Sequence, residues 1–170
     1  MAFAHNIAAA GRAIQHEIDG QLGPPEEGLW AGTQQVVPRS IVRGSRTYIE
    51  RVANQANGAY ENGWYDACAV MTRRLLETLI IEAFEKHGIA DRIKNTSGDF
   101  LHLGELIDRC LQEKTWNLGR NSKHAMPKLK DIGDKSAHSR RYLAHRGDVE
   151  PLLTDIRTVI QELVLLADLK

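Results

Sequence analysis

The chain has 170 residues, of which 42% are hydrophobic and 26% are charged. This size allows one hydrophobic core, and the apolar share excludes a disordered chain. Lys and Arg total 22 and Asp and Glu total 22, so the zero net charge excludes a protein that binds nucleic acid through general positive charge. Any site for a polyanion is therefore expected to be local.

The N-terminus lacks the positively charged start of a secretory signal, and no segment approaches the roughly 18 uninterrupted apolar residues of a membrane span. We therefore predict a cytoplasmic protein with no membrane contact. Cys68 and Cys110 fall among apolar positions of predicted helices, where a free thiol behaves as a small hydrophobic side chain. Two such cysteines fit a reducing compartment.

Residues 1–20 predict a first helix with a narrow apolar stripe, which is typical of docking on a surface. The following segment contains Gly23-Pro24-Pro25 and two further glycines, so it predicts a linker, with Trp30 as its anchor. Residues 1–35 are thus an N-terminal helix and linker, and residues 36–170 are the main domain. The stripe consists of Phe3, Ile7, Ala10, Ile14 and Ile18.

A second helix is expected to begin at about Ser40 and to continue until a turn near Gly63. The next helix, from Trp64 to about Phe84, is the most apolar and should be central, with Gly88 just past its end. The apolar face of the second helix consists of Ile41, Ser45, Tyr48, Val52, Ala56 and Ala59.

Three more helices follow, each with a predicted N-terminal cap: Asp99, Ser122 and Asp148. Pro127 is expected in the first turns of the second of these helices. No alternation typical of a strand competes with the helical spacing. The sequence therefore predicts an all-α bundle of four to five main helices with an additional N-terminal helix.

The stretch "DIGDKSAHSRRYLAH", residues 131–145, carries five basic or imidazole side chains within eleven positions. Helical spacing places Asp131 and Asp134 on the face of His138, so a carboxylate is expected to orient this imidazole. Gly133 and Ala137 are small enough to allow close packing on a neighbouring helix. The five side chains are Lys135, His138, Arg140, Arg141 and His145.

The connection after His138 is expected to be held to the bundle by Tyr142 and Leu143. Arg140, Arg141 and Arg146 should remain at its surface.

Three segments in order, "RRLLETLI", "LGELID" and "LKDIGDKSAH", precede an amphipathic C-terminal helix. Together they resemble the bacterial domain-of-unknown-function family 4145 (DUF4145) over about residues 36–169. That family is grouped with the HEPN superfamily, whose helical bundles often dimerise and include metal-independent RNases of toxin and antiphage systems. The resemblance implies a HEPN-like bundle, with fold carried over more firmly than activity.

The active HEPN pattern is an arginine, a polar residue, and a histidine four to six positions after the arginine. The counterpart of that histidine is His138, but Gly133 and Ile132 stand five and six positions before it. Arg140 and His145 match the spacing, although Arg141 occupies the second position. The missing arginine favours an interaction module without catalysis. The resemblance implies that this module is homodimeric and belongs to a bacterial defence or nucleic-acid-processing system.

The alternative is a metal-independent endoribonuclease that uses the region from His138 to His145. One of these imidazoles would take the ribose 2′-OH proton, with Arg140 as the third catalytic candidate. Lys135, Arg141 and Arg146 would bind the phosphate. A purely structural role for His138 also stays open, because a histidine at a helix C-terminus favours the negative end of the dipole.

One of Arg73 and Arg74 is expected to pair with Glu77 one turn later, and the resemblance suggests that one of them braces the final helix. No His-x-x-x-His, Cys-x-x-Cys or glycine-rich phosphate loop occurs, so no metal and no cofactor are predicted. The expected partners are a second copy of the chain, another protein or RNA.

Overall fold

The structure, a computed structural model, describes residues 35–170. The predicted first helix and the Trp30 anchor lie outside the described residues. Within them every regular element is a helix, as the sequence predicts, and five helices have ten or more residues. The elements are α2 (Arg39–Val42), α3 (Thr47–Glu61), α4 (Tyr65–Lys86), η1 (Ala90–Ile93), α5 (Leu103–Gln112), α6 (Arg120–His138), α7 (Arg146–Val149), η2 (Glu150–Leu152) and α8 (Leu153–Leu166).

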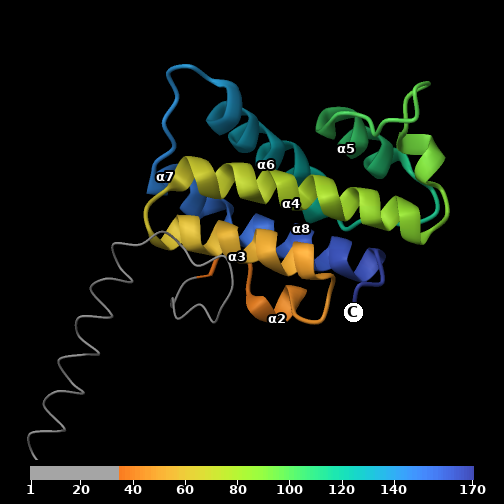
Figure 1. The fold of residues 1–170 in the computed structure, drawn as a ribbon, viewed down its shortest axis with the longest axis horizontal. Coiled ribbons are helices and arrows are strands. Elements are labelled where there is room, and N and C mark those ends of the chain that lie inside the picture. The colour runs from red at the N-terminus through yellow and green to blue at the C-terminus, as the bar shows by residue number, and fades with distance from the viewer. Residues whose placement is uncertain (1–34) are drawn as a thin grey trace, which may run out of the picture.

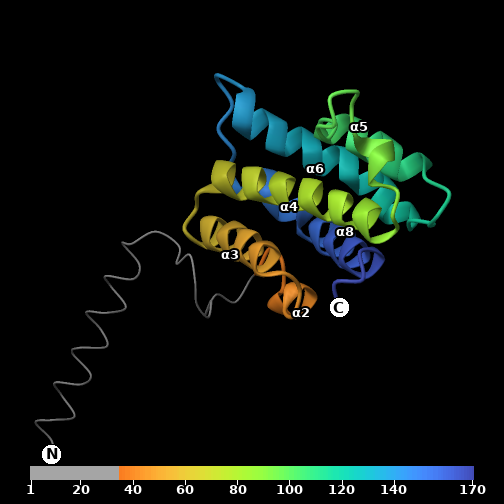
Figure 2. The same ribbon diagram turned by 45° about the vertical axis from the view of Figure 1, so that its right-hand side comes forward.

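Helix α4 runs through the middle of the bundle, as its apolar sequence predicts. Figures 1 and 2 show α5 and α6 on one side of it, with α3 and α8 on the other and the short α2 beyond them. Its buried residues face more than one neighbour. Leu75 and Leu79 lie in one row along the helix, and Leu76 and Ile80 lie in the adjacent row, and all four are buried. No helix in the described part of the chain is both long and apolar enough to cross a membrane.

The single helix expected from Ser40 is wrong, because the chain breaks between α2 and α3. Gly44 adopts φ +85°, a left-handed conformation that ends a helix and that glycine adopts without steric cost. Within α3 the predicted apolar face is confirmed at Val52, Ala56 and Ala59, which are buried. It is wrong at Tyr48, which is 42% exposed, while the neighbouring Ile49 is buried.

The predicted N-terminal caps of α5 and α6 are also wrong. Helix α5 begins after His102, not Asp99, and α6 begins after Gly119. The backbone N–H of Gly119 donates to Glu162 of α8 at 2.5 Å, so a tertiary contact supplies the cap. Ser122 is instead buried inside α6.

Pro127 is the eighth residue of α6 and therefore lies in its interior, not in the first turns. Proline has no N–H to donate to the carbonyl of Lys123. Both residues are exposed, so that carbonyl lies on the solvent side of the helix, where water can satisfy it.

The end of α4 follows the sequence prediction at Gly88. The N–H of Ile89 donates to the carbonyl of Phe84 and that of Gly88 to the carbonyl of Glu85, both at 3.0 Å. This is the Schellman pattern, and Gly88 provides its left-handed residue with φ +68°.

Glu82 is a buried carboxylate on α4, and it joins this helix to the chain that precedes α3. The Arg46 guanidinium lies 3.2 Å from Glu82, and the Tyr48 hydroxyl donates to the same carboxylate. A buried charge needs such partners, so this contact compensates Glu82 where α3 begins.

Glu113 holds the connection between α5 and α6 against η1. Arg92 donates to both of its oxygens, at 2.9 and 2.8 Å, and the Thr115 hydroxyl donates at 2.8 Å. The hydrogen bonds from Arg92 and then Thr115 lower the pKa of Glu113 from 4.5 to about 2.

This shift predicts how stability depends on pH. A carboxylate whose pKa is lower in the folded state stabilises the fold above its unfolded pKa, and this contribution is lost as the pH falls through the folded value. The difference in unfolding free energy between wild type and Glu113→Gln should therefore be constant above pH 4.5 and shrink as the pH falls towards about 2. Urea unfolding at several pH values measures it, and a difference that is the same at pH 7 and pH 3 contradicts the assignment.

Candidate functional site

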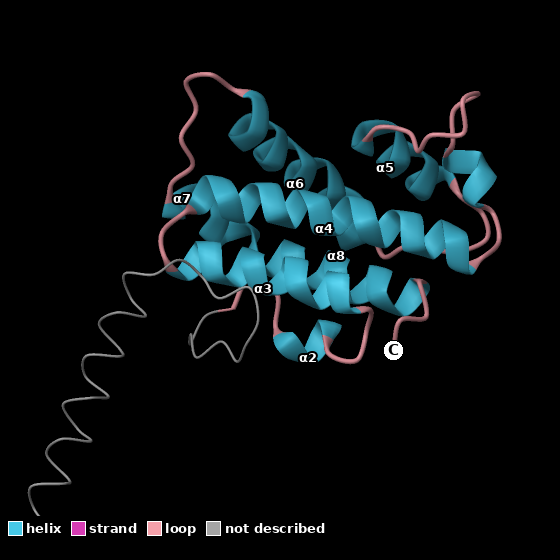
Figure 3. Ribbon diagram, in the orientation of Figure 1, coloured by secondary structure: helices cyan, strands magenta, loops and turns pink. Residues whose placement is uncertain are grey.

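The predicted site lies on the connection between α6 and α7, which Figures 1 and 3 show as an extended loop at one end of the bundle. His138 is the last residue of α6, and His145 is the N-cap of α7. Asp148 is thus not the N-cap of the last helix. It is the third residue of α7 and closes a capping box, in which the His145 N–H donates to its carboxylate at 2.8 Å.

The loop is fixed near its far end by Ala144, not by Leu143. The N–H of Ala144 donates to the carboxylate of Asp66 on α4 at 3.0 Å, and Ala144 is buried. Tyr142 is half-buried, whereas Leu143 is 70% exposed, so the prediction that Leu143 holds the loop is wrong. The apolar side chain of Leu143 is therefore more exposed than that of either neighbour, Tyr142 or Ala144.

The structure does not provide an orienting carboxylate for His138. Asp134 binds Arg73 and Lys130, and Asp131 pairs with Lys135 at 2.7 Å. The exposed imidazole of His138 makes no hydrogen bond or ion pair with any described residue. The expected pairing is therefore wrong, because both acidic residues are occupied by cations.

The cations of the loop divide into two groups. Lys135 is paired with Asp131, and Arg146 lies 3.2 Å from Glu150. Their carboxylate partners raise the pKa of both groups, so each stays a cation held along its helix. Arg140 and Arg141 are exposed and have no ion pair within residues 35–170.

Trp64 belongs to the same end of the bundle as Leu143. It is the N-cap of α4, 47% exposed, and it stands two residues before Asp66, which holds the loop. We use the name loop surface for Trp64, Arg140, Arg141 and Leu143. This surface combines two exposed apolar side chains with two exposed guanidinium groups.

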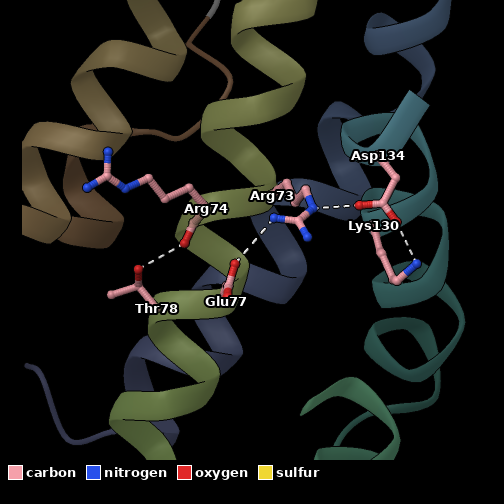
Figure 4. A network of polar contacts seen from close by, with 6 residues as sticks. All are labelled: Arg73, Arg74, Glu77, Thr78, Lys130 and Asp134. Atoms are coloured by element: carbon pink, nitrogen blue, oxygen red, sulfur yellow. Dashed lines mark hydrogen bonds and ion pairs between the residues drawn. The ribbon is translucent and has the colours of Figure 1, made fainter. Parts of the chain in front are cut away.

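A polar network joins α4 to α6 (Figure 4). Arg73 Nε donates to Asp134 Oδ1 at 2.6 Å, and Arg73 Nη1 lies 3.3 Å from Glu77 Oε2. Lys130 Nζ contacts the other Asp134 oxygen at 2.6 Å. The pairing with Glu77 agrees with the sequence prediction.

The helix that Arg73 braces is α6, not the final helix that the resemblance suggested. Arg74 is exposed on the other side of α4 (Figure 4), and its carbonyl accepts a hydrogen bond from the Thr78 hydroxyl at 2.9 Å. The two neighbouring arginines therefore have different roles, which follow from the face of α4 that each occupies.

Asp134 remains ionised because of this network. Partial burial by itself raises the pKa of Asp134, but the hydrogen bonds and charges of Lys130 and Arg73 outweigh it, and the net effect is a pKa below the ordinary value. Two cations and two carboxylates thus meet across the two helices with no net charge.

Gly133 makes the Arg73 contact sterically possible. A Cβ at this position would lie 2.5 Å from the Cβ of Arg73 and 2.9 Å from its Cδ. The stem of Arg73 therefore occupies the space above Gly133 on its way to Asp134. The sequence prediction of close packing at Gly133 is confirmed, whereas Ala137 is exposed.

The sequence did not indicate the exposure of Trp64 and Leu143 or the contact between Asp66 and Ala144. Asp66 precedes Ala144 by 78 residues, and Arg73 precedes Asp134 by 61. Neither contact leaves a local pattern. An apolar residue beside Arg140 and Arg141 was the only available signal, and it is equally compatible with burial.

No group of three His, Cys, Asp or Glu side chains that could hold a metal occurs in the described part of the chain. Two hollows on its surface, one between α2 and α8 and one beside Arg46 and Asp168, are not lined by any residue of the loop. Comparison of the chain with models of known protein families, with curated proteins and with solved structures gives no match.

Because the stem of Arg73 lies over Gly133, we expect replacement of this glycine with alanine to lower stability, the opposite of the usual effect. Replacing a glycine inside a helix with alanine normally stabilises a protein by about 1 kcal/mol. At Gly133 the added Cβ meets the stem of Arg73, and overpacking of this kind destabilises by about 1–3 kcal/mol. Gly133→Ala should therefore lower the urea midpoint.

Gly147 is the matched control, because it also lies in a helix but has no atom within 4 Å of an added Cβ. Gly147→Ala should leave the midpoint unchanged or raise it. Equal effects of the two substitutions would show that the helices are not in close contact at Gly133.

Proposed function

We propose that this chain is a HEPN-like helical association module that forms a homodimer through the loop surface. One observation supports it most directly: Leu143 is the most exposed large apolar side chain of the described residues, and it lies on a loop held by Asp66 and Asp148. Burying a leucine side chain completely is worth about 1.5–3 kcal/mol. A loop that is already fixed loses less conformational entropy on association than a mobile one.

The residue types of the loop surface also favour protein association. Tryptophan and arginine are enriched among the residues that contribute most to protein interfaces. Trp64 offers a large apolar ring, and Arg140 and Arg141 are free to form ion pairs across an interface.

A second copy of the chain is a suitable partner because a two-fold contact places the same patch on both subunits. Such a patch must complement itself, and this end of the bundle exposes both acidic and basic side chains. Glu61, the exposed last residue of α3, stands three positions before Trp64, while Arg140 and Arg141 supply the cations. The resemblance further suggests a bacterial defence or nucleic-acid-processing system as the setting of this module.

The alternative, a metal-independent RNase, has less support. His138, Arg140 and His145 lie on or beside one loop, but no carboxylate of the described residues sets the tautomer of His138. Base catalysis by an imidazole needs the correct nitrogen held towards its substrate.

Association should depend on Leu143 and Trp64. Light scattering at increasing protein concentration should give the mass of a dimer for wild type, and Leu143→Gln with Trp64→Ala should weaken association by about tenfold or more, since about 1.4 kcal/mol per tenfold is within reach of two buried apolar side chains. Leu165→Gln is the matched control, because Leu165 is also an exposed leucine, at 61%, but lies on α8. A monomeric wild type, or dissociation by Leu165→Gln alone, would contradict the proposed surface.

The RNase alternative is tested by incubating the full chain with mixed RNA in EDTA. We expect no cleavage above that of a His138→Ala, His145→Ala double variant, because no described group orients the imidazole of His138. Cleavage by wild type that the double variant lacks would instead establish the enzyme and place its chemistry on this loop.

A further inference from the structure

Charge is unevenly distributed over the five long helices of the bundle. Helices α3, α4, α5 and α8 each carry a net charge of −1, counted over the residues of each helix. Helix α6 contains five Lys or Arg and two Asp within its 19 residues, so its net charge is +3. A chain with no net charge thus concentrates positive charge on one helix, and a local concentration of this kind is what a polyanion site requires.

Three of the five cations of α6 have no carboxylate partner on that helix. Each of its two aspartates is paired with a lysine one turn away, at 2.7 and 2.6 Å. Arg120 forms no ion pair within the described part of the chain, and Lys123 donates to a neutral group, the side-chain oxygen of Asn117, at 3.3 Å. Lys128 lies 3.5 Å from Asp155 of α8, and 60% of its side chain is exposed. We use the name basic stripe for Arg120, Lys123 and Lys128.

The basic stripe lies on the solvent side of α6. Figures 1 and 2 show this helix on the side of α4 away from α3. Arg120, Lys123 and Lys128 are exposed, and helical geometry places them away from the buried side, within about 12 Å along the axis. A large partner can therefore reach all three at once. The buried side of α6 consists of Ser122, Ala125, Met126, Leu129, Ile132 and Gly133.

The residue types around the stripe select the class of polyanion. No exposed large apolar side chain of the described residues belongs to α6. Protein partners rely mainly on buried aromatic and apolar anchors, and single-stranded nucleic acid stacks its bases on aromatic side chains. A double helix needs neither, because its outer surface presents phosphates to basic and polar side chains. The stripe provides such cations, and the exposed Asn121 beside Arg120 adds an amide donor.

We propose that the basic stripe binds the phosphate backbone of a nucleic-acid double helix without reading its sequence. The planar guanidinium of Arg120 can hold two phosphate oxygens, and Lys123 and Lys128 act as point charges. Contact with so few phosphates gives weak binding that depends on the salt concentration. The inference goes beyond the association module, because no residue of the stripe belongs to the loop surface.

Fluorescence anisotropy with the full chain tests the proposal. The labelled probes are a DNA duplex of about 20 base pairs, two helical turns, the RNA duplex of the same sequence and the single DNA strand. We expect a duplex to bind at low salt, with a slope of about −3 for the logarithm of the association constant against the logarithm of salt, since each phosphate contact contributes about −0.9. The duplex that binds more tightly identifies the source of the phosphates. Absence of duplex binding, or tighter binding of the single strand, would overturn the proposal.

Substitutions locate the binding on α6. Arg120→Gln with Lys123→Gln should weaken duplex binding by about tenfold or more at low salt and bring the slope to about −1, because one contact remains. The matched control is Arg43→Gln with Arg74→Gln, which removes two charges from exposed positions outside α6, with Arg74 on the other side of α4 (Figure 4). It should change the affinity by no more than about twofold, because distant exposed charges are screened.

An equal loss of affinity in the control would show that binding follows the overall charge of the chain, and the proposal would fail. Poly-glutamate that displaces the duplex at an equal concentration of charge would assign the stripe to an acidic protein instead and would also reject it. The Leu143→Gln, Trp64→Ala variant should still bind the duplex. A monomeric protein that binds the duplex would reject the proposed function and leave this inference standing, whereas a dimer that binds no duplex would do the reverse.

Discussion

The close crossing of α4 and α6 at Gly133 determines where the loop surface lies. The stem of Arg73 passes through the space that a Cβ of residue 133 would fill, and this passage brings its guanidinium to 2.6 Å from Asp134. Lys130 and Glu77 complete the network, so two charges of each sign are compensated at a partly buried position. Since α6 ends five residues after Gly133, the same contact fixes the start of the loop.

This packing also determines which carboxylates remain as partners for the side chains of the loop. Asp134 would be the natural carboxylate for His138, but it is committed to the contact between the helices, and Asp131 is committed to Lys135. Without a carboxylate partner among the described residues, the imidazole of His138 can still form hydrogen bonds to a ligand. It lacks the fixed tautomer and direction that proton transfer requires. The loop is instead held at Ala144 and His145, which displays Arg140, Arg141 and Leu143 to solvent. A fixed, exposed and partly apolar loop is suited to association.

The two exposed leucines, Leu143 and Leu165, have different surroundings. Leu143 follows Arg140 and Arg141 on the exposed loop between α6 and α7. Leu165 lines a hollow between α2 and α8, together with Ile41 and Val164.

The sequence by itself determined the helical class, the central place of α4, its end at Gly88 and the small residue at Gly133, because periodicity, glycine geometry and side-chain size are local properties. It also indicated the pairing of an arginine with Glu77, one turn away on the same helix. Only the tertiary structure decided the contact of Glu162 with the start of α6, the partners of Asp134 and the exposure of Leu143. Each of these depends on residues far apart in the chain or on which face of a helix the rest of the bundle covers, and spacing along one segment contains neither.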